Sequence, residues 1–170
     1  MTISKVKQRF AIFMALAMVL FWIPCESVFA SDANMTISGG VLTAYNGGGG
    51  AVTIPSDVTS IGPSAFAGKP ISSVSIPSSV GSIADSAFAN CTALANVTIP
   101  GSVTNMGSGV FAGCSGLSSV SMQASISAIP ASTFSGCRSL TSIAISTGIT
   151  SIGSGAFSGC SSLSTMAIPS

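Results

Sequence analysis

Apolar residues recur along this chain with a long, nearly constant period, which is clearest in its phenylalanines. Five of them follow one another at spacings of 22, 23, 23 and 23 residues, namely Phe66, Phe88, Phe111, Phe134 and Phe157. A cysteine comes three residues after four of these rings, at Cys91, Cys114, Cys137 and Cys160. A fixed period of this length is typical of a solenoid. We therefore predict a mostly β repeat solenoid with five copies of 22–23 residues over residues 58–170.

One copy shows the local structure that the pattern predicts. The stretch Val97-Thr98-Ile99 alternates apolar and polar residues, as a short strand does. Pro100 then ends the strand because it has no amide hydrogen to donate. The later segment 111–114, Phe-Ala-Gly-Cys, is too short for a free helix, and a helical or 3₁₀ turn closed by glycine is expected there. Strands of successive copies are expected to pair in parallel on one face, with these turns on the opposite face.

The apolar residues of different copies occupy matching offsets. The third copy has them at Val103, Met106, Val110, Phe111, Cys114, Leu117, Val120 and Met122. The other copies match it, except that Thr133 takes the place of a small apolar residue and the first copy lacks the cysteine. A single copy cannot bury these groups, whereas stacked copies can, because each offset then becomes a continuous column. The five phenylalanines and four cysteines are thus predicted to be structural columns of one shared core.

Residues 31–57 differ from the repeats. The stretches 35–37, 40–45 and 51–55 alternate apolar and polar residues and favour strands. Asn46 and four glycines separate the last two stretches and indicate a hairpin turn. Because an open solenoid end would expose core and strand edge, we interpret residues 31–57 as an amino-terminal β cap.

Residues 1–30 have the order of a secretory signal peptide. Lys5, Lys7 and Arg9 precede a run of 14 apolar residues, 10–23, and Ala30 ends a stretch suited to cleavage. A membrane span needs about 20 apolar residues, so a membrane anchor is the weaker alternative. We expect cleavage after Ala30, a secreted or surface location, and a mature chain that does not span a membrane. Cys25 would be removed together with the signal peptide.

Charge is sparse after residue 30. Three carboxylates and two cations remain, Asp32, Asp57, Asp85, Lys69 and Arg138, for a net charge of −1, and there is no histidine. No basic patch exists to hold a nucleic-acid backbone, and no acidic cluster exists to hold calcium. Acid–base catalysis lacks its usual groups, and a Ser-His-Asp triad needs a histidine. We therefore expect no enzyme and assign no catalytic residue, cofactor or metal ligand.

The cysteine column allows two interpretations beyond metal binding. One thiol per 23 residues sets the sulfurs in a row, whereas zinc sites use closely spaced pairs with further ligands nearby. A ladder of buried reduced thiols is the first interpretation, because free cysteine is usually buried. Disulfides between adjacent coils are the second, since a spacing of roughly 5 Å lies in the permitted Cα range and secretion allows oxidation.

The exposed positions of the predicted strands form a candidate binding face. They are small side chains, namely Ser73, Ser75, Asn96, Thr98, Ser119, Ser121, Ser142, Ala144, Thr165 and Ala167. Strong protein interfaces draw on Trp, Tyr and Arg anchors, and this face has none. The pattern therefore leaves open a specific groove, a surface of many weak contacts and a plain scaffold.

The repeat Ser-Ile-Gly-x-x-Ala-Phe-x-Gly-Cys-x-x-Leu, followed by Ile-Pro, resembles the BspA-type leucine-rich repeat family from about Val58 to Pro169. The resemblance implies a leucine-rich-repeat-like solenoid on secreted or surface proteins, with adhesion to host proteins, cells or matrix among the roles of the family. Its strand residues would line the binding face. The chain departs from the repeat at Gln123 and Ser146, which replace proline, and at Pro130, which replaces glycine.

These observations lead to one functional hypothesis and its rivals. We expect a non-catalytic secreted or cell-surface interaction module that binds a protein or cell-surface ligand, with adhesion as its role. The alternatives are a structural element that self-associates through an uncapped carboxy-terminal end, and a fragment of a larger surface protein.

Overall fold

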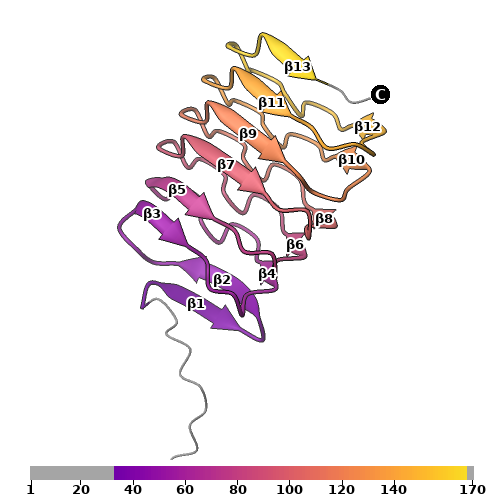
Figure 1. Cartoon of the computed structure of the whole chain (residues 1–170). Coiled ribbons are helices and arrows are strands. Elements are labelled where there is room, and N and C mark those ends of the chain that lie inside the picture. The colour runs from indigo at the N-terminus through magenta and orange to yellow at the C-terminus, as the bar shows by residue number, and fades with distance from the viewer. Residues whose placement is uncertain (1–32, 168–170) are drawn as a thin grey trace, which may run out of the picture. The chain divides into compact units, whose positions relative to one another are not determined.

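A computed structural model describes residues 33–167 of the 170-residue chain. The predicted signal peptide, residues 1–30, lies outside the described residues. Two series of strands alternate along the chain and lie on different sides of one stack of coils (Figure 1). The prediction of a mostly β, leucine-rich-repeat-like solenoid is confirmed, with parallel strands in register from coil to coil.

The longer strands form one parallel sheet of six, in the order β13-β11-β9-β7-β5-β3. Their bounds are β3 Gly50–Thr53, β5 Ile71–Ser75, β7 Asn96–Ile99, β9 Ser119–Met122, β11 Ser142–Ala144 and β13 Thr165–Ala167. In β7 the side chains alternate, so that Val97 and Ile99 are buried while Asn96 and Thr98 are exposed. This alternation places one half of each strand in the core and the other half on the predicted binding face.

The second series consists mainly of two-residue strands. Its bounds are β4 Ser60–Ile61, β6 Ser82–Ile83, β8 Asn105–Met106, β10 Ala128–Ile129 and β12 Ser151–Ile152. At the amino-terminal end, β1 Met35–Ser38 pairs antiparallel with β2 Val41–Tyr45, and β2 pairs in parallel with β4. Of the residues predicted as a cap, β1 and β2 thus join the short-strand sheet, whereas β3 joins the long-strand sheet.

The short-strand sheet is interrupted between β8 and β10, and Pro130 explains the break. In other coils the equivalent amide donates to the preceding coil, as Gly107 N does to Ile83 O at 2.8 Å and Gly153 N does to Ile129 O at 2.7 Å. Proline has no amide hydrogen and cannot make this bond. One departure from the repeat therefore divides the sheet into segments of five and two strands.

The third side of the stack holds turns, and the expectation of a helical or 3₁₀ turn there is wrong for the described residues. In the third coil Ala112 N bonds Gly109 O within the coil, at 2.9 Å, whereas Phe111 N bonds Thr133 O in the next coil, also at 2.9 Å. A 3₁₀ segment needs consecutive bonds within its own chain segment. Here every second amide binds the adjacent coil instead.

This alternation requires a positive φ angle on each side of the phenylalanine. Gly109 and Gly113 have φ values of 63° and 74°. The second coil uses Ser86 and Asn90 at the same positions, at 56° and 58°. Glycine and asparagine tolerate this region best, which accounts for the small and polar residues that flank each ring in the sequence.

The core is the stack of matching apolar offsets. The rings of Phe66, Phe88, Phe111, Phe134 and Phe157 follow one another with centroids 4.9–5.7 Å apart and planes within 17° of parallel. Tyr45 continues the column at 5.1 Å from Phe66. Aromatic rings attract one another in such offset stacks beyond the area they bury. Thr133, the one buried polar side chain within residues 33–167, donates its hydroxyl to Pro130 O at 2.7 Å.

Candidate functional site

The residues predicted to form the binding face lie in two columns across the long-strand sheet. Strand register places Ser73, Asn96, Ser119, Ser142 and Thr165 in one column, and Thr98, Ser121, Ala144 and Ala167 in the other, which Ser75 extends onto β5. All those up to Thr165 are exposed or half-buried. The sheet therefore presents a continuous uncharged surface of small side chains.

Each column continues one strand further than the sequence suggested. Ala51 lies opposite Ser73 and Thr53 lies opposite Ser75, and both are exposed. The sequence carried this signal, since 51–55 reads Ala-Val-Thr-Ile-Pro, the same alternation and the same proline as the repeat strands. Because we began the first copy at Val58, this strand was assigned to the cap and its exposed residues were left out of the predicted face.

Asn96 has the largest side chain of the face and is tied to the next strand. Its Oδ1 accepts hydrogen bonds from Ser119 Oγ at 2.6 Å and from Ser118 Oγ at 3.2 Å. These bonds fix the amide oxygen toward β9. The amide nitrogen Nδ2 makes no hydrogen bond within residues 33–167 and stays available to a ligand.

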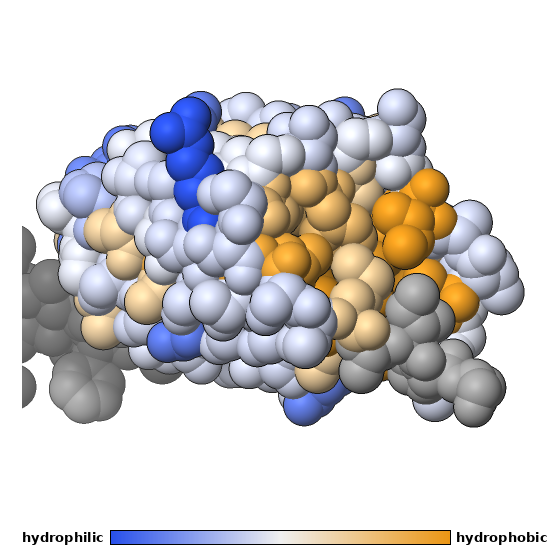
Figure 2. All heavy atoms as spheres, turned by 90° about the horizontal axis from the view of Figure 1, so that it is seen from above, coloured by the Kyte–Doolittle hydropathy of each residue, from blue (hydrophilic) through white to orange (hydrophobic). Residues whose placement is uncertain are grey.

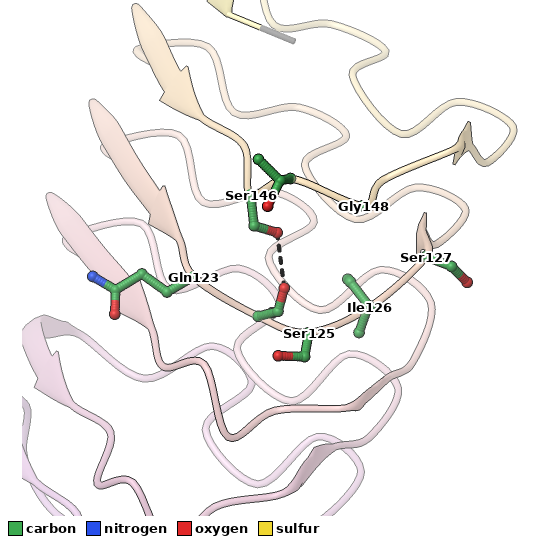
Figure 3. Close-up of a pocket in the computed structure, with 8 residues that line it drawn as sticks. Gln123, Ser125, Ile126, Ser127, Ser146 and Gly148 are labelled. Carbon is green, nitrogen blue, oxygen red and sulfur yellow. Dashed lines mark hydrogen bonds between the residues drawn. The ribbon is translucent and has the colours of Figure 1, made fainter. Parts of the chain in front are cut away.

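The corners after β9 and β11 are irregular, because Gln123 and Ser146 replace the proline of the repeat there. A shallow hollow of about 420 Å³ lies there, lined by Gln123, Ala124, Ser125, Ile126, Ser127, Ser146, Thr147 and Gly148. Figure 3 shows its polar side chains pointing in different directions, with Ser146 Oγ donating to Ala124 O at 2.8 Å. Because these groups do not converge, the corner is a weaker candidate than the sheet face.

The four cysteines form a ladder of thiols on the turn side of the core. Each donates to the carbonyl oxygen of the phenylalanine one coil earlier, as Cys114 Sγ does to Phe88 O at 3.1 Å and Cys137 Sγ does to Phe111 O at 3.2 Å. Cys91, Cys114 and Cys137 are buried, Cys160 is half-buried, and all four are free thiols. The structure thus contains the arrangement of the first interpretation.

The pKa is raised for three of these thiols, those of Cys114, Cys137 and Cys160. Desolvation, together with the neighbouring Cys160, raises the pKa of Cys137 to about 12. Desolvation also raises the pKa of Cys160, and the hydrogen bond with Cys91 and burial raise that of Cys114. Since the thiolate is the nucleophile and the metal ligand, Cys114, Cys137 and Cys160 are poor candidates for either role. The hydrogen bond with Cys114 lowers the pKa of Cys91, which is nevertheless buried.

The ionisable side chains do not gather into a site. No group of three or more His, Cys, Asp or Glu residues capable of holding a metal ion occurs within residues 33–167. Asp85 Oδ1 accepts a hydrogen bond from Ser108 N at 2.7 Å and so supports the turn of the next coil. Within the same range, no helix has the length and apolar character to cross a membrane.

The last coil leaves part of the core uncovered. Ile152 is 46% exposed, and Ile149, Phe157, Leu163 and Met166 are only partly buried. Figure 2 looks onto this end of the stack and shows an apolar area bordered by hydrophilic residues. Their counterparts in the preceding coils are buried beneath the next coil.

Parallel strands in register, stacked core residues and a small-residue strand face define a leucine-rich-repeat-like solenoid. The chain belongs to the family described as 'BspA type Leucine rich repeat region (6 copies)', whose model matches residues 51–170. Our prediction of the family is therefore confirmed. The match begins within β3, before the first of the five copies that we delimited at Val58.

Solved structures give the same fold. A leucine-rich repeat protein from Bacteroides ovatus is 31% identical, with a TM-score of 0.59, over 65% of this chain and 28% of the other. One from Eubacterium ventriosum is 24% identical, with a TM-score of 0.65, over 82% and 47%. A leucine rich cell surface protein from Faecalibacterium prausnitzii is 25% identical, with a TM-score of 0.52, over 80% and 53%.

The matched part of each of these proteins is only a portion of its length, at most 53% among the three. A comparison with curated proteins finds no match. The comparisons thus establish the fold and the family of this chain. Its ligand and its cellular role are argued below from its own surface.

Proposed function

We propose that this protein is a non-catalytic interaction module, secreted or held at the cell surface, that adheres to proteins of a host or a neighbouring cell. The observation that carries the proposal is the pair of exposed columns that runs without a charged residue across all six long strands. The family match supports an interaction role, and the Faecalibacterium relative, described as a cell surface protein, supports the location. The signal-like residues 1–30 agree with this location.

The face suits adhesion through many weak contacts. It lacks aromatic or arginine anchors, so no single residue is expected to dominate the binding energy. Affinity would then come from the repetition of similar contacts along the stack and from multiple copies at a surface.

Retention of the purified mature chain on immobilised matrix proteins and on intact cells tests the proposal. Ser142→Arg places a bulky charge on the exposed face and is expected to reduce retention. Ser158→Arg is the matched control, since Ser158 is equally an exposed serine but lies on the turn side. Equal loss in both variants, or no retention of the parent chain at micromolar concentration, would contradict the proposal.

The apolar end of the last coil favours a second candidate, self-association of the chain through this end. Ile152, which is 46% exposed, would be covered by a second copy. Light scattering of the parent chain should then show a concentration-dependent mass that Ile152→Glu lowers to that of a monomer. A monomeric parent chain at high concentration would contradict this candidate.

A further inference from the structure

The ladder between β5 and β7 is the loosest in the long-strand sheet. It registers one residue pair, Ser73 opposite Asn96. The neighbouring ladders, β3 with β5 and β7 with β9, register four pairs each. The sheet is therefore least regular at one position of the exposed face, toward its amino-terminal end.

The first repeat is also one residue shorter than the second, in the segment that leads into the strand. Val74 follows Phe66 by eight residues, whereas Val97 follows Phe88 by nine, because Lys69-Pro70-Ile71 replaces the usual Cys-x-x-Leu. The registered pair joins the third residue of β5 to the first residue of β7, and no pair is registered beyond it.

A hollow of about 380 Å³ lies where the register is lost. It is lined by Val74, Ser75, Ile76, Asn96, Val97 and Thr98. Val74 and Ile76 are each 9% exposed, whereas Ile99 on the next strand is fully covered. The hollow thus has a slightly exposed apolar floor and a rim of the outward side chains.

Three polar groups of this rim have no hydrogen-bond partner within residues 33–167. They are the Ser75 hydroxyl, the Thr98 hydroxyl and Asn96 Nδ2. Because Asn96 Oδ1 is held by Ser119 on β9 and by Ser118 just before it, the amide nitrogen is turned away from that strand. The hollow therefore offers one fixed donor and two hydroxyls that can donate or accept.

The lining decides which chemical group fits. No charged side chain lines the hollow, so a charged group would lose its hydration there without a partner of opposite charge. The aromatic rings of the described residues lie in the core column, so the face offers no ring on which a sugar could stack. An amide has one donor and one acceptor in a small uncharged plane and complements these groups.

We propose that the hollow between β5 and β7 binds an uncharged amide group presented by an extended segment of a partner protein. This inference rests on the proposed function, because it assigns to the interaction face the point where a protein ligand is anchored. The remaining strands of the face then make the weaker, repeated contacts.

A titration of the isotope-labelled mature chain tests the hollow without any knowledge of the natural partner. The probe is the capped neutral tripeptide acetyl-Ala-Gln-Ala-amide, and methyl glucoside is the comparison. The tripeptide should shift the amide resonances of Ser75, Asn96 and Thr98 and the Asn96 side-chain amide, while those of Ser121 and Ser142 stay in place. Shifts with the glucoside alone, shifts spread evenly over the face, or no shifts would overturn the inference.

Two variants sharpen the test. Thr98→Val keeps the side-chain shape and removes one hydroxyl, which should weaken binding of the tripeptide roughly fivefold, the loss of about one hydrogen bond. Ser158→Ala removes a hydroxyl from an exposed serine on the turn side and should leave binding unchanged. Equal effects of the two variants would contradict a site in the hollow.

The titration also separates this inference from the proposed function. Tripeptide binding without retention on matrix proteins or cells would support a binding site in the hollow and contradict the adhesion role. Retention on cells without tripeptide binding would support the adhesion role and contradict a binding site in the hollow.

Discussion

The contribution of a single residue to the stability of this protein depends on the stacked column to which it belongs. Phe111 has a ring on each side, with centroids 5.4 Å and 5.7 Å away, and no exposed surface. Phe157 has one described ring neighbour and is partly exposed. The same residue type therefore contributes differently in the middle and at the end of the stack.

We expect Phe111→Ala to lower the free energy of unfolding by about 3–5 kcal/mol, because it removes buried contacts and leaves a cavity. Phe157→Ala should cost clearly less, since its ring is partly in water already. Urea unfolding of both variants measures the difference. Equal costs would mean that the column does not bury its middle members more fully than its last one.

The thiol ladder predicts a loss of stability at alkaline pH. The folded-state pKa of Cys137 is about 12, raised from an ordinary value of 9.0. A group with a raised folded-state pKa contributes stability that is complete below the unfolded value and is lost as pH rises toward the folded value. Unfolding free energy should thus be insensitive to Cys137 below about pH 8 and fall between about pH 9 and 12.

Urea unfolding across this pH range, with Cys137→Ala as the comparison, checks the effect. The variant is expected to be less stable at neutral pH but to show a shallower alkaline fall. An identical fall in both proteins would contradict the assignment to this thiol.

At the scale of elements, backbone amides decide how each coil joins the next. Gly107 donates to Ile83 O and lies directly against the preceding coil, where an added Cβ would approach Asp85 N to 2.5 Å. Gly101 is less confined, since its nearest neighbour to an added Cβ is Gln123 O at 3.4 Å. Glycine is thus required at one of these positions and is less constrained at the other.

Gly107→Ala should destabilise the protein by about 1–3 kcal/mol, because the added methyl forces adjacent coils apart. Gly101→Ala should stay within about 1 kcal/mol of the parent chain, since a restricted unfolded state offsets a modest local adjustment. Thermal unfolding of the two variants compares them directly. Similar melting temperatures would indicate that the coils are not held so closely at Gly107.

The β1–β2 hairpin is the element that ends the stack on the amino-terminal side. Its two strands pair antiparallel, whereas the other strands pair in parallel, and Tyr45 covers the first ring of the phenylalanine column. We propose that it acts as the cap expected from residues 31–57. The last coil has no described counterpart of this hairpin, which leaves Ile152 exposed.

At the scale of the whole molecule, contacts run mainly between neighbouring coils, as they do in other solenoids. Stability should then depend on the number of interfaces between coils rather than on one central core. Duplication of residues 103–125, one full period, tests this property.

The lengthened chain is expected to fold, to unfold in one transition and to have a larger dependence of unfolding free energy on urea, because more surface is buried. Urea unfolding and circular dichroism measure both quantities. Loss of cooperative unfolding would contradict a stack in which equivalent coils are interchangeable.

The sequence by itself determined the solenoid, its period, the family and the buried and exposed halves of each strand. It could do so because side chains at one offset of every copy meet in one column, so a one-dimensional repeat becomes a three-dimensional contact. The alternation in 51–55 would also have extended the face to Ala51 and Thr53, had the copies been divided at the strand rather than at Val58.

Only the tertiary structure decided how the coils bond to one another. The amides beside Phe111 have two possible acceptors, one within the coil and one in the next coil, and only stacking selects between them, which replaces the expected 3₁₀ turn. The break at Pro130 and the loosened ladder at Ser75 likewise depend on what lies one coil away. A local sequence window carries no information about that neighbour, because the hydrogen-bond partner lies about 23 residues distant along the chain.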